Sequence, residues 1–192
     1  MTIRFLSSLV FGVAVVASAL AQKPQSKVEV AELAAGCFWG VEESFRTIPG
    51  VTSTEVGYEG GSLAKPSYEA VSSGRSGHAE TVKIAFDPSK VSYAQLLDHF
   101  FKMHDPTTLN AQGNDRGTQY RSAIFYRDEK QKAEAMTFMA KVEKSGAWKS
   151  KVMTSLEKGG GFNPAEDYHQ KYLVKHPGGY DNHYMRKISF DK

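Results

Sequence analysis

The spacing of apolar side chains changes several times along the chain, and each spacing predicts an element. Between residues 38 and 48 apolar positions recur every three or four residues, which predicts a helix that ends at Pro49-Gly50. Over residues 81–86 they alternate, which is typical of a half-buried strand. Ser92, with Gln95 three positions later, has the composition of a capping box and predicts a second helix start.

Taken in chain order, these patterns give strand, helix, strand, strand, helix and strand. That order predicts an α+β protein with the split βαβ, ferredoxin-like arrangement of a two-layer sandwich, followed by an extra helix and strand and a long irregular C-terminal segment. Asn163-Pro164 with Glu166 predicts one more helix start, because asparagine caps helices and proline suits their first turn. Long irregular segments are where functional residues concentrate. The predicted strands are 28–34, 51–56, 81–86, 120–126 and 152–156, the third helix is 128–144, and the irregular segments are 57–77, 104–119 and 176–192.

The first 21 residues differ from this domain in composition. Arg4 provides a positive start, an apolar run covers residues 9–17, and small residues of the kind found at a cleavage site end at Ala21. We expect a cleaved secretory signal peptide over residues 1–21, a periplasmic or secreted protein, and one domain over residues 22–192. The alternative is an uncleaved membrane anchor, for which the apolar run is short, since a spanning helix needs about 20 residues.

Overall composition is typical of a soluble globular protein with one domain. Of 192 residues, 41% are hydrophobic and 23% are charged. Removing Arg4 with the leader lowers the formal net charge from +3 to +2, and the basic residues are scattered, so nucleic acid is not an expected partner. The chain has neither an HExxH sequence nor a cysteine cluster, so we expect no metal and no other cofactor. We expect a monomer.

The sequence contains one cysteine, Cys37, and therefore no disulfide framework. A free cysteine is either an inert buried apolar residue or a reactive thiol. Cys37 lies in Gly36-Cys37-Phe38-Trp39-Gly40, where the first strand gives way to the first helix, and free amides at a helix start favour an anion. We therefore expect a lowered pKa for the thiol, by about one unit from the helix alone. A further donor or the substrate must add to that effect.

The pentapeptide around Cys37 resembles the active-site motif of the peptide methionine sulfoxide reductase A family. Five further segments resemble blocks of the same family and occur in the family's order, from about residue 28 to 180. The resemblance implies that residues 22–192 form a catalytic domain that reduces methionine S-sulfoxide, free or in proteins, to methionine. The five segments are Gly57-Tyr58-Glu59-Gly60-Gly61, Pro66-Ser67-Tyr68-Glu69-x-Val71, Gly77-His78-Ala79-Glu80, Asn114-Asp115-Arg116-Gly117-Thr118-Gln119-Tyr120-Arg121-Ser122 and Ala165-Glu166-x-Tyr168-His169-Gln170.

The resemblance also implies roles for individual residues. Cys37 would attack the sulfoxide sulfur and become a sulfenic acid, and Glu80, held protonated by burial, would supply a proton to the departing oxygen. The hydroxyls of Tyr68 and Tyr120 would bind that oxygen, and Asp115 would hold water or fix the pocket through hydrogen bonds. The residues that would form an apolar wall around the S-methyl group are Phe38, Trp39 and Tyr180.

Plainer roles remain open for these residues. Glu80 by itself is compatible with a solvated strand end, Asp115 with a turn, and the aromatic residues with ordinary core packing. Two other functions also remain open: a cysteine–histidine acyl transferase or hydrolase, and a binding module that recognises oxidised methionine without turnover. No histidine has a spacing that requires contact with Cys37, so structural roles are expected for them. The histidines concerned are His78, His169, His176 and His183.

The chain departs from many members of the family near its C-terminus. In those proteins the sulfenic acid is resolved by a cysteine that commonly follows the tyrosine of a Pro-x-Gly-Tyr segment. Here Pro177-Gly178-Gly179-Tyr180 is followed by Asp181. We therefore expect the single-cysteine type, in which the sulfenic acid is met by an external thiol from a thioredoxin-like protein, a glutaredoxin-like protein or a small molecule.

Overall fold

The computed structural model describes residues 28–191, so the predicted signal peptide lies outside the described residues. The strands are β1 (Glu29–Ala35), β2 (Val51–Glu59), β3 (Ala79–Phe86), β4 (Ala111–Gln112), β5 (Asp115–Arg116), β6 (Ser122–Tyr126), β7 (Ser155–Lys158) and β8 (Asn163–Pro164). The helices are α1 (Phe38–Arg46), α2 (Tyr68–Ser72), α3 (Tyr93–Met103), α4 (Glu129–Ser145) and α5 (Tyr172–Lys175), with a 3-10 turn, η1, over Thr118–Tyr120.

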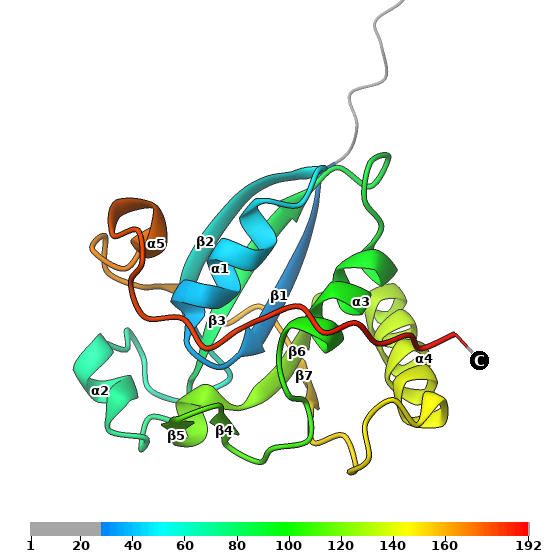
Figure 1. Cartoon of the computed structure of the whole chain (residues 1–192). Coiled ribbons are helices and arrows are strands. Elements are labelled where there is room, and N and C mark those ends of the chain that lie inside the picture. Colours follow the sequence, from blue (N-terminus) through cyan, green and yellow to red (C-terminus); the bar gives the residue numbers. More distant parts are fainter. Residues whose placement is uncertain (1–27, 192) are drawn as a thin grey trace, which may run out of the picture.

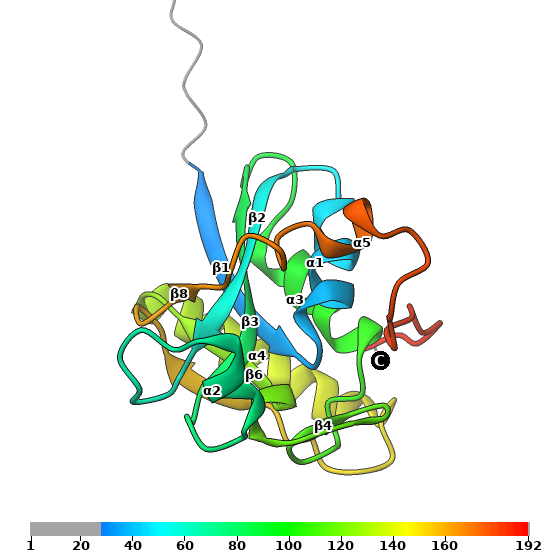
Figure 2. The same ribbon diagram turned by 90° about the vertical axis from the view of Figure 1, so that its left-hand side faces the viewer.

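The centre of the main sheet has the predicted split βαβ arrangement. β1, α1, β2, β3, α3 and β6 follow one another along the chain, and the strands lie in the order β6-β1-β3-β2. β1 pairs antiparallel with β3 and β6, and β2 pairs antiparallel with β3. This is the ferredoxin-like order, so the predicted α+β fold class is confirmed. β7 extends one edge in parallel with β6 (Figure 1), and β8 extends the other edge beside β2 (Figure 2).

Helices α1, α3 and α4 cover one face of this sheet (Figures 1 and 2). Alternation along β1 sends every second side chain, Leu33 among them, into the core on that face. Phe45 of α1 packs against His99 of α3 with ring centroids 5.0 Å apart, which joins the two helices. The capping box predicted for α3 is present, because Ser92 and Gln95 each bond the other's backbone.

The other face of the sheet is crossed by the chain between β7 and β8, which lie at opposite edges. Gly160 and Gly161 in this crossing donate their backbone N–H groups to Glu59 Oε1 at 3.0 and 3.1 Å. Glu59 and Glu32 are both buried, and Oε2 of each lacks a hydrogen-bond partner within the described chain. Arg127 donates to Oε1 of Glu32 at 2.6 Å. Burial, with the charge of Glu32, raises the pKa of Glu59 to about 7.

The helix predicted to start at Asn163-Pro164 does not form, and that prediction was wrong. Both residues belong to β8, which pairs with Gly57 and Tyr58 of β2. Glu166, the acid expected in the first turn of that helix, instead accepts 2.9 Å hydrogen bonds from the Tyr58 hydroxyl and the Tyr68 N–H. Long-range pairing therefore outweighs the local capping signal, and the first helix of this region is α5.

Other predicted boundaries move by a few residues. The segment predicted as irregular at 57–77 contains the end of β2 and the short α2, and 104–119 contains β4 and β5. β7 starts at Ser155 rather than at residue 152. Residues 176–191 form no helix or strand, as predicted, and run from α5 past the start of α1 toward α3 and α4 (Figure 1). Within the described part of the chain, no helix combines the length and apolar character needed to cross a bilayer.

Candidate active site

Cys37 occupies the N-cap position of α1, directly after β1, which confirms the predicted strand–helix junction. Gly36 before it has φ +97°, a conformation that favours glycine, and it turns the chain from strand to helix. The backbone N–H of Trp39 points to the sulfur. The thiol is therefore held where the chain changes direction, at the end of the sheet.

The thiol does not have the lowered pKa that its position at a helix start predicts. Cys37 is 8% exposed, and its burial, with the carboxylate of Glu80, raises the pKa of the thiol above its usual range. The Trp39 N–H acts in the opposite direction and is the weaker influence. A helix start stabilises a charge by at most ~2 kcal/mol, whereas burial of an ion costs several kcal/mol. Desolvation therefore dominates, and the resting thiol is protonated at neutral pH.

Glu80, the second residue of β3, lines the same cavity as Cys37 and is 2% exposed. Its Oε2 accepts a 3.0 Å hydrogen bond from the backbone N–H of Phe38, the first residue of α1. Burial raises the pKa of Glu80 to about 8, against the weaker lowering effect of that hydrogen bond. Glu80 is therefore mainly a neutral carboxylic acid at pH 7, the protonation state that a proton donor needs.

A cavity of about 180 Å³ brings the predicted site residues together. Tyr68 enters it from the start of α2 and Tyr120 from the end of η1. Neither hydroxyl has a hydrogen-bond partner among residues 28–191, so both are free to bind a ligand. Burial raises the pKa of Tyr120, which keeps its hydroxyl a neutral donor. The lining consists of all the residues singled out from the sequence, namely Cys37, Phe38, Trp39, Tyr68, Glu80, Asp115, Tyr120 and Tyr180.

The indole of Trp39 is held by two residues to which the sequence assigned no site role. His169, 1% exposed, accepts a 3.0 Å hydrogen bond at Nδ1 from Trp39 Nε1, and its ring lies 5.0 Å from that of Phe38. Tyr172 stacks on the indole with centroids 3.7 Å apart and planes 9° apart. A signal for His169 was present in the segment Tyr168-His169-Gln170, whereas nothing in the sequence indicated Tyr172.

Asp115 connects the cavity to the C-terminal segment. Its Oδ1 accepts a 2.9 Å hydrogen bond from the Tyr180 hydroxyl, and its Oδ2 accepts one of 2.9 Å from Asn182 Nδ2. Asn182 Nδ2 also donates to the carbonyl of Gln112 in β4 at 2.9 Å. Asp115 therefore fixes the pocket through hydrogen bonds, which is one of the two roles expected for it.

Asp181, which follows Tyr180 in place of a cysteine, packs with His183 against the first turn of α1. A Cβ added to Gly40 would lie 2.1 Å from Asp181 Oδ1 and 2.4 Å from His183 Nδ1. His183 Nε2 donates to the carbonyl of Ala35 at 2.7 Å, and the imidazole lowers the pKa of Asp181. The glycine at position 40 is therefore needed for close contact with the C-terminal segment.

Across the described residues, no histidine is hydrogen-bonded to Cys37. The ring of His78 bonds the backbone of Gly61 and Leu63, while His169 and His183 have the partners given above. A cysteine–histidine nucleophile pair therefore finds no support in the geometry. Between residues 28 and 191 no group of three or more histidine, cysteine or acidic side chains is placed to hold a metal ion.

Comparisons with known proteins agree with this arrangement. The family profile described as peptide methionine sulfoxide reductase matches residues 29–192. The MsrA of Methanothermobacter thermautotrophicus is 51% identical over 152 residues, covering 79% of this chain and 90% of that protein. Reduced Mxr1 of Saccharomyces cerevisiae superposes with a TM-score of 0.79 at 35% identity, covering 91% of this chain and all of that one. Methionine sulfoxide reductase A of Corynebacterium diphtheriae gives 0.72 at 34% identity, covering 86% and 83%.

Both the sequence and the fold match over most of the chain, and the matched residues include the whole cavity lining. The chain therefore belongs to the peptide methionine sulfoxide reductase family.

Proposed function

We propose that Cys37 attacks the sulfur of methionine S-sulfoxide in this enzyme and that Glu80 is the proton donor. As a member of its family the chain is a methionine sulfoxide reductase, and the proposal concerns the residues that carry the reaction. The observation that supports it best is the shared cavity. The chain's one thiol, a carboxyl group with a pKa of about 8 and two tyrosine hydroxyls without protein partners all line it.

The sulfoxide oxygen binds between the hydroxyls of Tyr68 and Tyr120 and the carboxylic acid of Glu80. Glu80 gives its proton to this oxygen as the sulfur of Cys37 attacks the sulfoxide sulfur, and the thiol proton restores the acid form of Glu80. The attack forms a bond between the Cys37 sulfur and the methionine sulfur. The protonated oxygen then passes from the methionine sulfur to the Cys37 sulfur as the bond between the two sulfurs breaks, which leaves Cys37 as a sulfenic acid and releases methionine. Cysteine sulfur is oxidised by two electrons and sulfoxide sulfur is reduced by two.

The raised pKa of the Cys37 thiol fits this order of events. In the resting site both Cys37 and Glu80 are neutral, so no uncompensated charge is buried. A bound sulfoxide brings a polar oxygen into a site whose donors are already in place. The thiolate therefore forms only when transfer of a proton to that oxygen compensates its charge.

Regeneration requires a thiol from outside the chain, because Cys37 is the sole cysteine of the sequence. A first thiol condenses with the sulfenic acid, releases water and forms a mixed disulfide; a second thiol releases Cys37 and leaves as a disulfide. We propose a thioredoxin-like or glutaredoxin-like protein, or a small thiol, as the donor. Turnover with each of these donors under equal conditions identifies which one serves.

We also propose that the enzyme is exported and repairs oxidised exported proteins. The supporting observation is the signal-peptide pattern of residues 1–21. Expression of the full chain, followed by fractionation and N-terminal sequencing, should give a mature protein that starts at Gln22. A chain recovered with Met1 intact from the cytoplasmic fraction would contradict export.

A single-turnover assay tests the assignment of Cys37. Without reductant, the protein should form about one methionine per chain from an S-sulfoxide peptide, since one thiol gives one sulfenic acid, and none from the R epimer. A dione reagent specific for sulfenic acids should then label Cys37, and Cys37→Ser should give neither product. Binding without methionine formation would support the binding module, and ester cleavage without sulfenic acid would support the hydrolase.

A further inference from the structure

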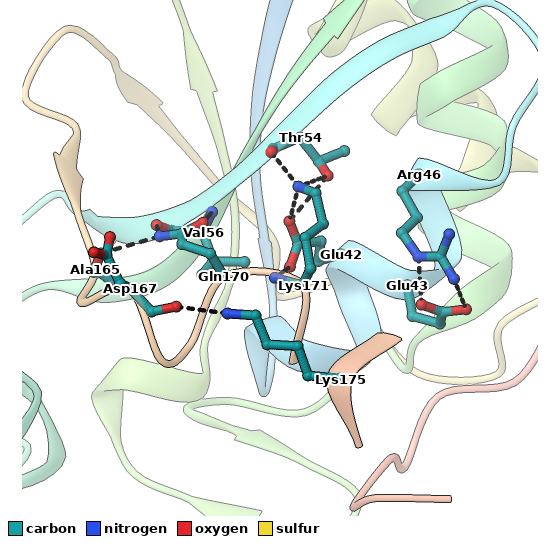
Figure 3. A network of polar contacts seen from close by, with 10 residues as sticks. All are labelled: Glu42, Glu43, Arg46, Thr54, Val56, Ala165, Asp167, Gln170, Lys171 and Lys175. Carbon is teal, nitrogen blue, oxygen red and sulfur yellow. Dashed lines mark hydrogen bonds and ion pairs between the residues drawn. The ribbon is translucent and has the colours of Figure 1, made fainter. Parts of the chain in front are cut away.

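A network of polar contacts around the buried carboxylate of Glu42 links α1 to β2 and to the segment 165–175, and the reaction described above does not use it (Figure 3). Glu42 lies three residues after Trp39 on α1 and is 1% exposed. Its Oε2 accepts the backbone N–H of Lys171 at 2.8 Å, and its Oε1 accepts Lys171 Nζ at 2.6 Å and the hydroxyl of Thr54 at 2.9 Å. One carboxylate on α1 thus receives hydrogen bonds from both the backbone and the side chain of a residue 129 positions away.

The segment that carries Lys171 has little regular structure of its own. Over residues 165–175 only the four residues of α5 are helical, so side-chain anchors determine where the segment lies. The amide of Gln170 bonds both the N–H and the carbonyl of Val56 in β2, at 2.9 and 2.8 Å. Lys171 has φ +54°, a left-handed conformation that residues with a side chain rarely adopt, and its bonds to Glu42 hold the backbone there.

The anchored residues lie in sequence between the two residues that contact the Trp39 indole. His169 precedes Gln170 and bonds the indole nitrogen; Tyr172 follows Lys171 and stacks on the indole face. Trp39 and Glu42 are on the same helix, one turn apart. The pair formed by Glu42 and Lys171 therefore joins the helix that carries the indole to the segment that holds it.

We propose that Glu42 and Lys171 are positioning residues that fix the Trp39 indole against His169 and Tyr172, and thereby set the affinity of the enzyme for methionine sulfoxide. This inference rests on the proposed role of Trp39 in binding the S-methyl group. It predicts an effect on substrate binding and none on the chemical step, because neither residue lines the cavity that holds Cys37 and Glu80.

Two substitutions remove the ion pair while keeping the shape of the side chains. Lys171→Met retains the apolar stem and the backbone N–H, and Glu42→Gln retains one acceptor oxygen. Glu43→Gln is the matched control, because Glu43 pairs with Arg46 on the same helix, both side chains are 33% exposed, and no hydrogen bond or ion pair drawn in Figure 3 joins either of them to the segment 165–175. Circular dichroism and thermal unfolding establish that each variant is folded.

We expect Lys171→Met and Glu42→Gln to raise KM for a methionine sulfoxide peptide by about tenfold, with kcat within about twofold of the parent. Glu43→Gln should change neither. Trp39 fluorescence, recorded in a Trp148→Phe background, should shift in the two variants and not in the control. A lower melting temperature with unchanged KM and unchanged fluorescence would show a purely structural pair and overturn the inference.

A double variant distinguishes the positioning role of Lys171 from the proposed role of Trp39 in binding the S-methyl group. If Lys171 acts through Trp39, then Lys171→Met in a Trp39→Phe background should add less than about twofold to KM, whereas independent effects would multiply. An unchanged KM in Trp39→Phe alone would contradict the proposed wall. A raised KM in Trp39→Phe with an unchanged KM in Lys171→Met would contradict only the positioning role.

Discussion

The backbone N–H of Phe38 donates a 3.0 Å hydrogen bond to Oε2 of Glu80, 42 positions later in the sequence. Phe38 is the first residue of α1, so this N–H is one of the free amides at the helix start. One of the amides expected to stabilise a thiolate therefore holds the acid instead. The helix start positions thiol and carboxyl relative to each other, while burial keeps both protonated.

The rate of sulfoxide reduction should fall as the pH rises through about 8. The pKa of Glu80 is raised to about 8, so its acid form is the main form below that pH and is lost above it. Single-turnover methionine formation from pH 6 to 9.5 measures this limb. A rate that continued to rise to pH 9.5 would show that thiolate formation, and not the acid, is limiting.

Glu80→Gln should reduce the single-turnover rate by a factor of about 10²–10⁴ and remove the decline near pH 8. The amide has a similar shape but no transferable proton. Glu69→Gln, an exposed glutamate on α2, is the control and should behave as the parent. An unaltered pH profile in Glu80→Gln would mean that another group titrates.

Tyr68→Phe and Tyr120→Phe should each lower kcat, and the double variant should lose at least the ~10²–10³ associated with one donor to a developing oxyanion. Each substitution removes one hydroxyl from the cavity and little else, since neither hydroxyl bonds any part of the described protein. Tyr184→Phe, 64% exposed, is the control. A double variant with normal kcat would leave Glu80 as the only group acting on the oxygen.

Gly40→Ala should weaken the contact between α1 and the C-terminal segment. The added Cβ would lie 2.1 Å from Asp181 Oδ1, so the segment must move, and Tyr180 with it. We expect a loss of about 1–3 kcal/mol in the free energy of unfolding and a higher KM. Gly161→Ala, which would meet no atom within 4 Å, should leave both unchanged in urea unfolding and kinetic assays.

Glu59→Gln should stabilise the protein at pH 8 and have little effect at pH 5. The folded state raises the pKa of Glu59 to about 7, so it binds a proton more strongly than the unfolded chain does, and stability falls as the pH rises toward and through 7. Glutamine does not titrate, so the gain at pH 8 should be on the order of 2 kcal/mol. Urea unfolding at both pH values measures it, with Glu55→Gln, a partly exposed residue of the same strand, as control.

Sequence patterns predicted the central βαββαβ unit correctly because its elements follow local rules. The 81–86 alternation became part of β3, and Ser92 with Gln95 formed its capping box. The predicted helix start at Asn163-Pro164 was wrong. These residues have the sequence of a good helix cap, but they pair with β2 instead. That pairing joins residues more than 100 positions apart, so no local sequence pattern indicates it.

The residues that line the cavity could be predicted because each lies in a segment that resembles a motif of the family. The pKa of Cys37 could not be predicted from the sequence. It depends mainly on how much water the fold excludes from the thiol, whereas the sequence indicates only that the thiol lies at a helix start. Tyr172 was missed for a related reason: its contact with Trp39 is a long-range one, and the left-handed turn at Lys171 just before it is not indicated by any local pattern. The roles of the individual residues stay predictions until the variants are measured.

The burial of Cys37 also affects the enzyme when it is idle. Peroxides and disulfides react with thiolates, and a chain with one cysteine has no neighbouring thiol to intercept a sulfenic acid before it is oxidised irreversibly. Cys37 is 8% exposed and burial raises the pKa of its thiol, so we expect it to react slowly with such oxidants at rest. We therefore expect the desolvation that makes the reactivity of Cys37 conditional on a bound sulfoxide to protect the idle enzyme from oxidation as well.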